Sequence, residues 1–319
     1  MLFRSGARLA VRAMAKNIVV VGSLNLDLVA KVPRNPEVGE TITGTDFNRF
    51  IGGKGANQAV AASLLGGKVK MIGRHGTDGL ETGLLATLRE KGVGIDSMTP
   101  ADGPSGVAVI LVTDEGHNSI VVIPGSNGRF CPEDVFASRS RIEQAGIVLT
   151  QLETPLETLE ATMDVAFASG VPVVLDPAPA RSLSPKLLGR LDWLTPNETE
   201  AAFYCGERAP DGDLRAYAER LLALGPRNVL LKLGARGAYL ATVSGIREQV
   251  AAIPVRAVDS TAAGDALNGA FAAALMNGAD PIEAVRFGVA AASFSVTRAG
   301  AIPSLPTLAE VEEFRLKRS

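Results

Sequence analysis

Residues 147–175, IVLTQLETPLETLEATMDVAFASGVPVVL, contain two short apolar runs on either side of one longer segment. The runs Ile147–Leu152 and Val171–Leu175 are rich in Val, Ile and Leu, as expected of buried strands. Leu156–Ala168 has the spacing of a helix and stops at Gly170, as helix C-termini commonly do. A strand, a helix and a second strand in this order predict two parallel strands joined by a crossover helix.

The same alternation continues along the chain from Asn17 onward, with Gly79–Lys91 reading as another helix. Further apolar runs that read as buried strands are Ile18–Val21, Val69–Ile72 and Val229–Leu233. We therefore predict an α/β fold with a mostly parallel central sheet covered by helices on both faces. No repeat, low-complexity segment or linker divides the chain, so residues 16–319 are predicted to form one domain.

Two stretches, about residues 29–50 and 106–123, depart from this pattern of strands and helices. They alternate apolar and polar residues as antiparallel strands do. The second stretch has Asp114-Glu115-Gly116 where a hairpin would turn. We predict that both stretches form a small antiparallel sheet, here called the lid, that projects from the main domain.

Composition excludes several classes of protein. The 319 residues are 46% hydrophobic and carry a formal net charge of −2, without the basic stripe that nucleic-acid binding needs. The two cysteines, Cys131 and Cys205, show no metal-binding spacing, which favours a reducing, cytoplasmic compartment and argues against zinc. No apolar run reaches the ~18 residues that span a bilayer.

The first fifteen residues are basic and contain no acid, since Arg4, Arg8 and Arg12 recur every fourth position and the first acid is Asp27. Such a start is typical of an organelle transit peptide. The other reading is a tail that precedes a natural start at Met14. Both readings stay open, and the tail is preferred.

Two common phosphate-binding patterns, G-x-x-x-x-G-K-[ST] and G-x-G-x-x-G after the first strand, are absent. Instead, Asp259-Ser260-Thr261-Ala262-Ala263-Gly264-Asp265 directly precedes the small-residue helix Ala266–Met276. Small residues at a helix start let backbone N–H groups converge on an anion, and the helix dipole favours negative charge there. Asp265 can then accept a proton from a hydroxyl beside that anion, or it can merely cap its helix.

A second glycine cluster, Gly52-Gly53-Lys54-Gly55-Ala56-Asn57-Gln58-Ala59, opens another small-residue helix that runs to about Leu65. Together with the stretch at residues 259–265 it resembles the paired signatures of the phosphofructokinase-B (ribokinase-like) superfamily of sugar kinases. The resemblance extends from Asn17 to about Leu308. It implies an enzyme that transfers a phosphoryl group from ATP to the 5-hydroxyl of a pentose, with D-ribose as the leading candidate. Deoxyribose, fructose, a nucleoside such as adenosine or a keto-deoxy sugar acid stay open as substrates, and a non-catalytic sugar sensor stays open as a role.

The resemblance also assigns roles to individual residues. Asp265 would be the general base, and the backbone amides of Ala262, Ala263 and Gly264 would form an anion hole for the transferred phosphoryl group. The positions that would hold the sugar hydroxyls are Asn25, Asp27, Gly53, Lys54, Asn57 and Glu153. The alternative for Asn25 and Asp27 is a pair of turn residues after the first strand, and for Glu153 a solvated loop acid.

On the nucleotide side, Asn197 and Glu200 match an N-x-x-E motif that organises Mg²⁺, largely through water. The same spacing is also a helix-capping box. The glycines Gly234 and Gly237 resemble the loop beside the nucleotide, to which Gly264 also belongs. Lys232 stands where the family often carries Thr, which leaves its contact with phosphate open.

The resemblance further implies a K⁺ site beside the anion hole and a homodimer built through the lid. The K⁺ site would map to Asp259, Thr261, Ser295, Arg298, Gly300 and Ser304, several of them through backbone carbonyls. An ordinary turn after a helix is the alternative for the last four. A dimer would cover the apolar lid face that carries Val107, Val109, Val121 and Ile123.

Overall fold

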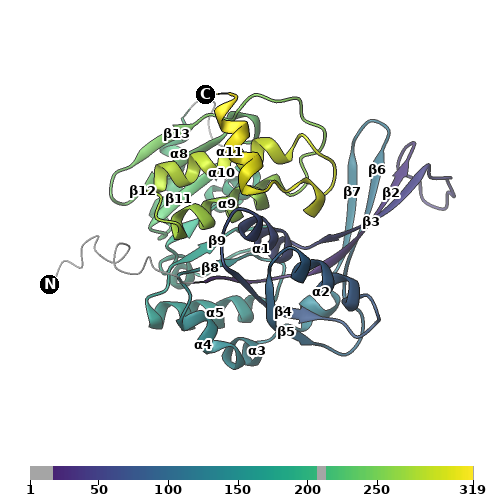
Figure 1. Cartoon of the computed structure of the whole chain (residues 1–319), viewed down its shortest axis with the longest axis horizontal. Coiled ribbons are helices and arrows are strands. Elements are labelled where there is room, and N and C mark those ends of the chain that lie inside the picture. Colours follow the sequence, from purple (N-terminus) through teal and green to yellow (C-terminus); the bar gives the residue numbers. More distant parts are fainter. Residues whose placement is uncertain (1–16, 207–212, 319) are drawn as a thin grey trace.

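The computed structural model describes residues 17–206 and 213–318, so the predicted extension at residues 1–15 lies outside the described residues. A nine-stranded sheet forms the centre of the fold (Figure 1). In spatial order its strands are β13 (Arg247–Val250), β12 (Ala238–Thr242), β11 (Asn228–Lys232), β10 (Trp193–Leu194), β9 (Val173–Leu175), β8 (Ile147–Thr150), β1 (Ile18–Val21), β4 (Val69–His75) and β5 (Gly94–Pro100).

Strands β11 through β5 pair in parallel, while β12 and β13 form an antiparallel extension at one edge. This confirms the predicted mostly parallel sheet. The unit read from residues 147–175 is present as β8, α5 (Leu156–Ser169) and β9, and α5 ends at Gly170 in the left-handed conformation.

Helices cover both faces of the sheet, as predicted. Besides α5 they are α1 (Lys54–Leu64), α2 (Glu81–Glu90), α3 (Pro132–Ala137), α4 (Arg139–Glu143), α6 (Pro185–Leu188), α7 (Glu198–Cys205), α8 (Leu214–Ala223), α9 (Ala263–Met276), α10 (Pro281–Ser295) and α11 (Leu308–Leu316). Alternate residues of β1 face opposite layers: Ile18 and Val20 join the core with α1, α9 and α10, whereas Val19 and Val21 join the core with α3, α4 and α5. A period of two along a strand buried on both faces produces this division.

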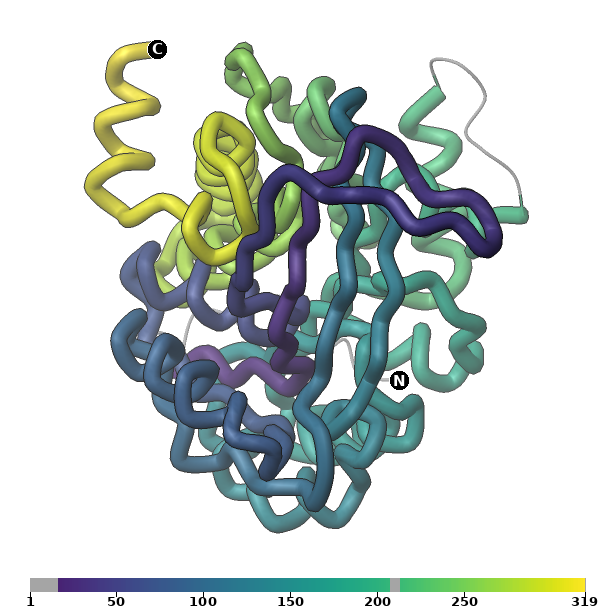
Figure 2. Tube along the Cα trace, turned by 90° about the vertical axis from the view of Figure 1, so that its right-hand side faces the viewer, coloured from purple at the N-terminus to yellow at the C-terminus, as the bar shows by residue number. Residues whose placement is uncertain are grey.

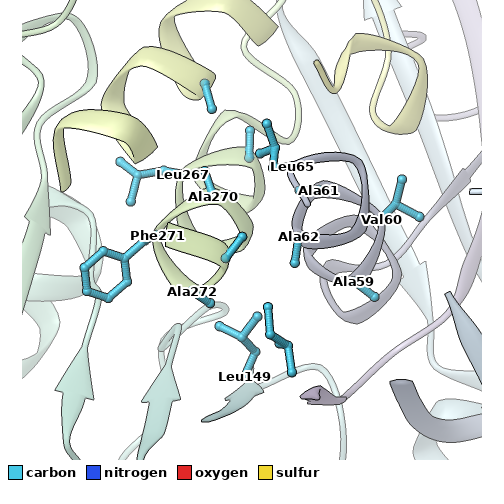
Figure 3. Close-up of a cluster of buried hydrophobic side chains, with 14 of the residues drawn as sticks. Ala59, Val60, Ala61, Ala62, Leu65, Leu149, Leu267, Ala270, Phe271 and Ala272 are labelled. Carbon is cyan, nitrogen blue, oxygen red and sulfur yellow. The ribbon is translucent and has the colours of Figure 1, made fainter. Parts of the chain in front are cut away.

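Helices α1 and α9 lie side by side, with Ala61 and Ala62 of α1 on the side that faces α9 (Figure 3). Gly269 of α9 lies so close to α1 that a Cβ there would be 2.6 Å from the Ala61 Cβ and 2.7 Å from the Ala62 nitrogen. At the start of α1, a Cβ on Gly55 would be 2.5 Å from the Ser23 nitrogen. Small residues in the helices that follow the two signatures therefore let α1 and α9 approach each other, and Gly55 within the first signature lets α1 approach the end of β1.

The lid is a separate four-stranded sheet that projects from one side of the molecule (Figures 1 and 2). Its order is β3 (Asp46–Gly52), β2 (Asn25–Val32), β6 (Gly106–Thr113) and β7 (Asn118–Ile123). The predicted hairpin between β6 and β7 is confirmed, because the Gly116 N–H donates to the Thr113 carbonyl at 2.8 Å.

The lid corrects two expectations from the sequence. Its first strand begins at Asn25 and not at residue 29, and residues 33–45 lie outside its strands. The central pair of strands, β2 and β6, is parallel, although the alternation predicts only antiparallel neighbours. The reason is the connection to the main sheet: β2 follows β1 and β6 follows β5, and these two strands run in the same direction.

No helix within residues 17–206 and 213–318 combines the length and the apolar composition that crossing a membrane requires.

Candidate active site

The residues selected from the sequence gather where neighbouring parallel strands of the large sheet end. Lys232 ends β11, Asn197 follows β10, Glu153 follows β8, and Asn25 begins β2 after a three-residue connection from β1. Helices α1 and α9 begin at the same edge. In open α/β sheets this carboxyl edge is where ligands bind.

Asp265 lies in the first turn of α9 with only 4% of its surface exposed. Its carboxylate accepts a hydrogen bond from Asn57 Nδ2 at 3.0 Å and another from Gln58 Nε2 at 3.0 Å. Burial, partly offset by the Lys54 ammonium and reinforced by Asp176, raises the pKa of the Asp265 carboxyl to about 6. Asp265 is therefore ionised at neutral pH but easily protonated, as a general base should be.

The start of α9 has an unusual backbone conformation. Ala262 has φ 59°, and within residues 17–206 and 213–318 no other non-glycine residue has a positive φ. Such strain costs on the order of 1–3 kcal/mol and persists only where the surroundings impose it. The Ala263 N–H, one of the predicted anion-hole donors, already donates to the Ser260 carbonyl at 3.2 Å. The first N–H groups of a helix have no partner within the helix, so the start of α9 supplies donors for an anion.

The predicted sugar-binding residues surround the start of α1. Asn57 donates to Asp265 through its nitrogen, while its buried Oδ1 has no hydrogen-bond partner. A buried acceptor without a donor is costly, so this oxygen is suited to a hydroxyl of a bound ligand. Asn25 accepts from Asn127 Nδ2 at 2.7 Å, which fixes the orientation of its amide. Glu153 accepts from the Lys54 backbone N–H at 2.9 Å and so caps α1.

Asp27 lies at the stem of the lid, directly against Gly52, where a Cβ would collide with its carboxylate. Burial, together with the charges of Glu153 and Asp265, raises the pKa of Asp27 to about 7. Burial alone would lower the pKa of the Lys54 ammonium, but neighbouring carboxylates, chiefly Asp265 and Asp176, raise it above its usual range. The site thus holds several acids at close quarters, with Lys54 among them.

Asn197 and Glu200 form the predicted capping box at the start of α7. The Glu200 N–H donates to Asn197 Oδ1 at 2.8 Å, and the Asn197 N–H donates to Glu200 Oε2 at 2.8 Å. Asn197 Nδ2 donates to the second carboxylate oxygen at 2.9 Å. Burial, opposed by Lys232 and reinforced by Asp176, raises the pKa of Glu200. The residues described contain no cluster of three or more His, Cys, Asp or Glu side chains arranged to hold a metal.

The two glycines predicted beside the nucleotide differ in their surroundings. Gly234 has φ 56° at the start of a short 3₁₀ turn, and a Cβ there would meet no atom within 4 Å. Gly237 has φ 87° and packs against β13, where a Cβ would collide with the Val250 carbonyl. The requirement for glycine at 237 therefore has a packing cause.

The residues mapped to the K⁺ site lie on two adjacent loops that Asp259 joins. Asp259 Oδ1 accepts from the Thr261 N–H at 2.9 Å, and Oδ2 accepts from the Gly300 N–H at 2.8 Å. The hydroxyls of Ser295 and Ser304 donate to carbonyls three residues earlier in the chain. Arg298 pairs with Glu310 at 2.5 Å. The polar side chains in this region thus already have hydrogen-bond partners, most of which are backbone groups.

Comparison with known proteins assigns the chain to a family. The model of the pfkB family of carbohydrate kinases matches residues 15–308. The chain belongs to the pfkB family of carbohydrate kinases. It is 40% identical over 303 residues to the ribokinase of Haemophilus influenzae, covering 94% of this chain and 99% of that protein. It is 34% identical to the deoxyribokinase of Salmonella typhi, covering 93% and 98%. The ribokinase of Arabidopsis thaliana in complex with ribose and ATP matches at 35% identity with a TM-score of 0.88, covering 94% of this chain and 99% of that one.

Several polar residues of the candidate site were not identified by the sequence analysis. Gln58 and Asp176 contact each other and are buried, and Asn127 holds Asn25. Ser23 donates to Glu153 at 2.5 Å. The available signals were weak: Gln58 lies within a quoted signature, and Asp176 is an acid directly after a buried strand.

The raised pKa of Asp27 predicts how the stability of this kinase depends on pH. Between pH 3.8 and about 7 the folded protein holds a proton on Asp27 that the unfolded chain releases. The folded state thus binds more protons, and its stability falls as pH rises through this window. Asp27→Asn removes the free-energy cost of ionising this buried carboxyl. Without ligands, the free energy of unfolding of the variant should therefore match that of the wild type near pH 4 and exceed it above pH 7 by up to a few kcal/mol.

Urea denaturation at a series of pH values measures this difference. Asp46→Asn, which alters an exposed aspartate of the same sheet, is the matched control for the change in formal charge. The prediction is contradicted if the difference in unfolding free energy between Asp27→Asn and the wild type stays constant from pH 4 to pH 8, because the pKa of Asp27 would then not be raised in the folded protein.

Proposed function

We propose that the protein transfers the γ-phosphoryl group of ATP to the 5-hydroxyl of D-ribose. The observation that carries this proposal is the buried Asp265 carboxylate, held by Asn57 and Gln58 at the start of α9. Beside it, Asn57 Oδ1 is an acceptor ready for a hydroxyl. Ribose is favoured among sugars because relatives named ribokinase match nearly the whole chain at up to 40% identity. The deoxyribokinase relative at 34% keeps deoxyribose as the second candidate.

The residues support a direct transfer. The Asp265 carboxylate takes the proton of the sugar hydroxyl as that oxygen bonds to the γ-phosphorus, and the bond from phosphorus to the β-phosphate oxygen breaks. Charge on the moving phosphoryl group meets the N–H groups of Ala262 and Gly264 and the positive end of the α9 dipole. Transition states of this type are loose, so position and charge matter more than the strength of the base. Asn25, Asp27, Lys54 and Glu153 would hold the sugar beside Asp265.

Mg²⁺ fits the nucleotide side of the site through water. The Glu200 oxygens are occupied by Asn197, so direct ligation would break the capping box. Burial is the main cause of the raised pKa of Glu200, and Lys232 opposes it more strongly than Asp176 reinforces it. A cation nearby would favour the ionised form of this buried carboxylate. When bound, Mg²⁺ would neutralise charge on the nucleotide phosphates. The N–H groups of the Gly234 turn and the Lys232 ammonium would contact the nucleotide itself.

Replacement of Asp265 tests the proposal. Asp265→Asn should keep the affinity for ATP and ribose but lower kcat by roughly 10²–10⁴-fold, because the hydroxyl loses its proton acceptor. The measurement is ADP release across ribose, deoxyribose, fructose and adenosine. Asp280→Asn, which alters the exposed cap of the neighbouring α10, is the matched control and should turn over normally. Normal turnover by Asp265→Asn would show that Asp265 is not the base and serves only at the start of its helix.

We also propose that K⁺ binds between the loops joined by Asp259. The engaged hydroxyls of Ser295 and Ser304 leave backbone carbonyls as the main ligands, with Asp259 setting the spacing of the loops. Potassium in place of sodium, at constant ionic strength with Mg²⁺ and ATP fixed, should raise kcat roughly fivefold or more, because the cation would fix the loop that begins α9. Asp259→Ala should lose this response, whereas Asp213→Ala, at the cap of α8, should keep it. Equal rates in both salts for the wild type would dismiss the site.

The lid supports a homodimer. Val109 pairs with Val121 and Val107 with Ile123, so their side chains share one face. The exposed fractions of Ile120, Val121 and Val122 on the edge strand β7 are 56%, 63% and 51%. An exposed apolar edge strand is a template for pairing with another chain. Val121→Glu should convert the dimer to monomers in sedimentation equilibrium, while Val243→Glu, equally exposed but far from the lid strands in sequence, should not. A wild-type protein that sediments as a monomer would contradict the proposed dimer.

A cytoplasmic location of the protein stays a prediction.

A further inference from the structure

A buried ion pair lies among the ends of the central strands. Asp176, directly after β9, is 1% exposed, and its Oδ1 accepts from Lys232 Nζ at 2.7 Å. Its Oδ2 accepts from Gln58 Nε2 at 2.9 Å. Both carboxylate oxygens therefore have strong partners on two different elements, β11 and α1.

Gln58 connects this pair to the base. The two N–H groups of its amide go to two carboxylates, one to Asp176 and the other to Asp265 Oδ1 at 3.0 Å. Its Oε1 accepts from Gln151 Nε2 at 2.7 Å. The amide cannot flip without turning its oxygen toward two carboxylates, so Gln151 and the acids fix its orientation. Lys232, Asp176, Gln58 and Asp265 thus form one continuous chain of contacts.

The Lys232 end of the chain lies at the start of α9. A Cβ on Gly264 would be 3.4 Å from Lys232 Nζ, so the ammonium lies beside the first turn of α9, where N–H groups have no partner within the helix. An ammonium next to such donors adds positive charge where a phosphoryl group would gather negative charge. The Asp265 end of the chain is the proposed proton acceptor. The two ends therefore correspond to the two chemical tasks of a phosphoryl transfer.

We propose that Asp176 is a positioning residue for phosphoryl transfer, holding Lys232 beside the start of α9 and, through Gln58, orienting the Asp265 carboxylate. The inference rests on the proposed function, since it assumes that Asp265 and Lys232 act on the sugar hydroxyl and the phosphoryl group. A purely structural role is disfavoured, because buried ion pairs often stabilise a fold no better than apolar residues of similar size.

Two members of this chain of contacts, Asp176 and Gln58, have opposite effects on the pKa of the Asp265 carboxyl. The groups that face Asp265 are Lys54, Asn57 and Gln58 from α1, Asp176 after β9, and Asp27 on β2. Of these, Asp176 raises the pKa of Asp265 while the Gln58 hydrogen bond lowers it. Removing the charge of Asp176 and removing the amide of Gln58 should therefore shift the pKa of Asp265 in opposite directions.

A titration that needs no substrate tests this prediction. In the full-length protein labelled with ¹³C at aspartate side chains, the Asp265 signal is identified by its loss in Asp265→Asn. It should titrate near pH 6 in the wild type. Asp176→Asn should lower this pKa and Gln58→Met should raise it. Thr162→Val, a buried change within α5 far from the site in the fold, should leave it unchanged. Unmoved Asp265 signals in both site variants would overturn the proposal.

Kinetics supply the second readout. Asp176→Asn should lower kcat roughly 10- to 100-fold, as expected when reacting groups are misplaced by about 1 Å, while the KM for ribose changes little. The acid limb of its kcat profile should move to lower pH, and that of Gln58→Met to higher pH. If Asp176→Asn does not fold, the double variant Asp176→Asn with Lys232→Met removes both charges together. It should lower the pKa of Asp265 by less, because losing the Lys232 ammonium acts in the opposite direction. Normal kcat in a folded Asp176 variant would contradict a positioning role. A wild type inactive toward ribose would refute the proposed function, whereas the titration judges the link to Asp265 separately.

Discussion

The close crossing of α1 on α9 is the constraint on which the site depends. At Gly269 no side chain separates the two helices, and the neighbouring residues of α1 are alanines. This approach brings Asn57 and Gln58 within 3.0 Å of Asp265. A larger residue at 269 would push the helices apart and carry both amides out of hydrogen-bonding range, because such bonds weaken within a few tenths of an ångström. Two signatures that lie about 200 residues apart in sequence are thus one structural unit.

The site concentrates charge that the rest of the fold must tolerate. Its acids are Asp27, Glu153, Asp176, Glu200 and Asp265, and its bases are Lys54 and Lys232. Two of the acids have their pKa raised toward neutrality, which means that ionising them in the folded state costs free energy. The cores on the two faces of the sheet offset this cost by burying the alternating residues of strands such as β1. Active sites commonly destabilise the free protein in this way, because the charges that repel one another there are the ones that interact with a bound ligand.

The sequence predicts the fold through periodicity, which needs no knowledge of distant contacts. The α/β class, the crossover unit at residues 147–175 and a helix after the 259–265 stretch all follow from local patterns. That helix was predicted to begin at Ala266, and it begins at Ala263. The parallel pairing of β2 with β6 does not, because alternation has the same period in parallel and antiparallel strands. Gln58 and Asp176 were missed for a related reason: each looks ordinary in its own segment, and only the folded chain brings them together. The motif at Asn197 and Glu200 did signal a capping box, and that box is present, while its relation to a metal is a separate question.

Strand β2 joins the two parts of the molecule as a stiff lever. Its eight residues, Asn25–Val32, run from the active site to the outer lid and span about 26 Å at ~3.3 Å per residue. Asn25 and Asp27 lie at the fulcrum, and the ladders to β3 and β6 on either side resist bending. A small rotation about the inner end of β2 therefore becomes a much larger displacement at its outer end. A contact made at the outer end of the lid therefore bears on the positions of Asn25 and Asp27 at the inner end of the same strand.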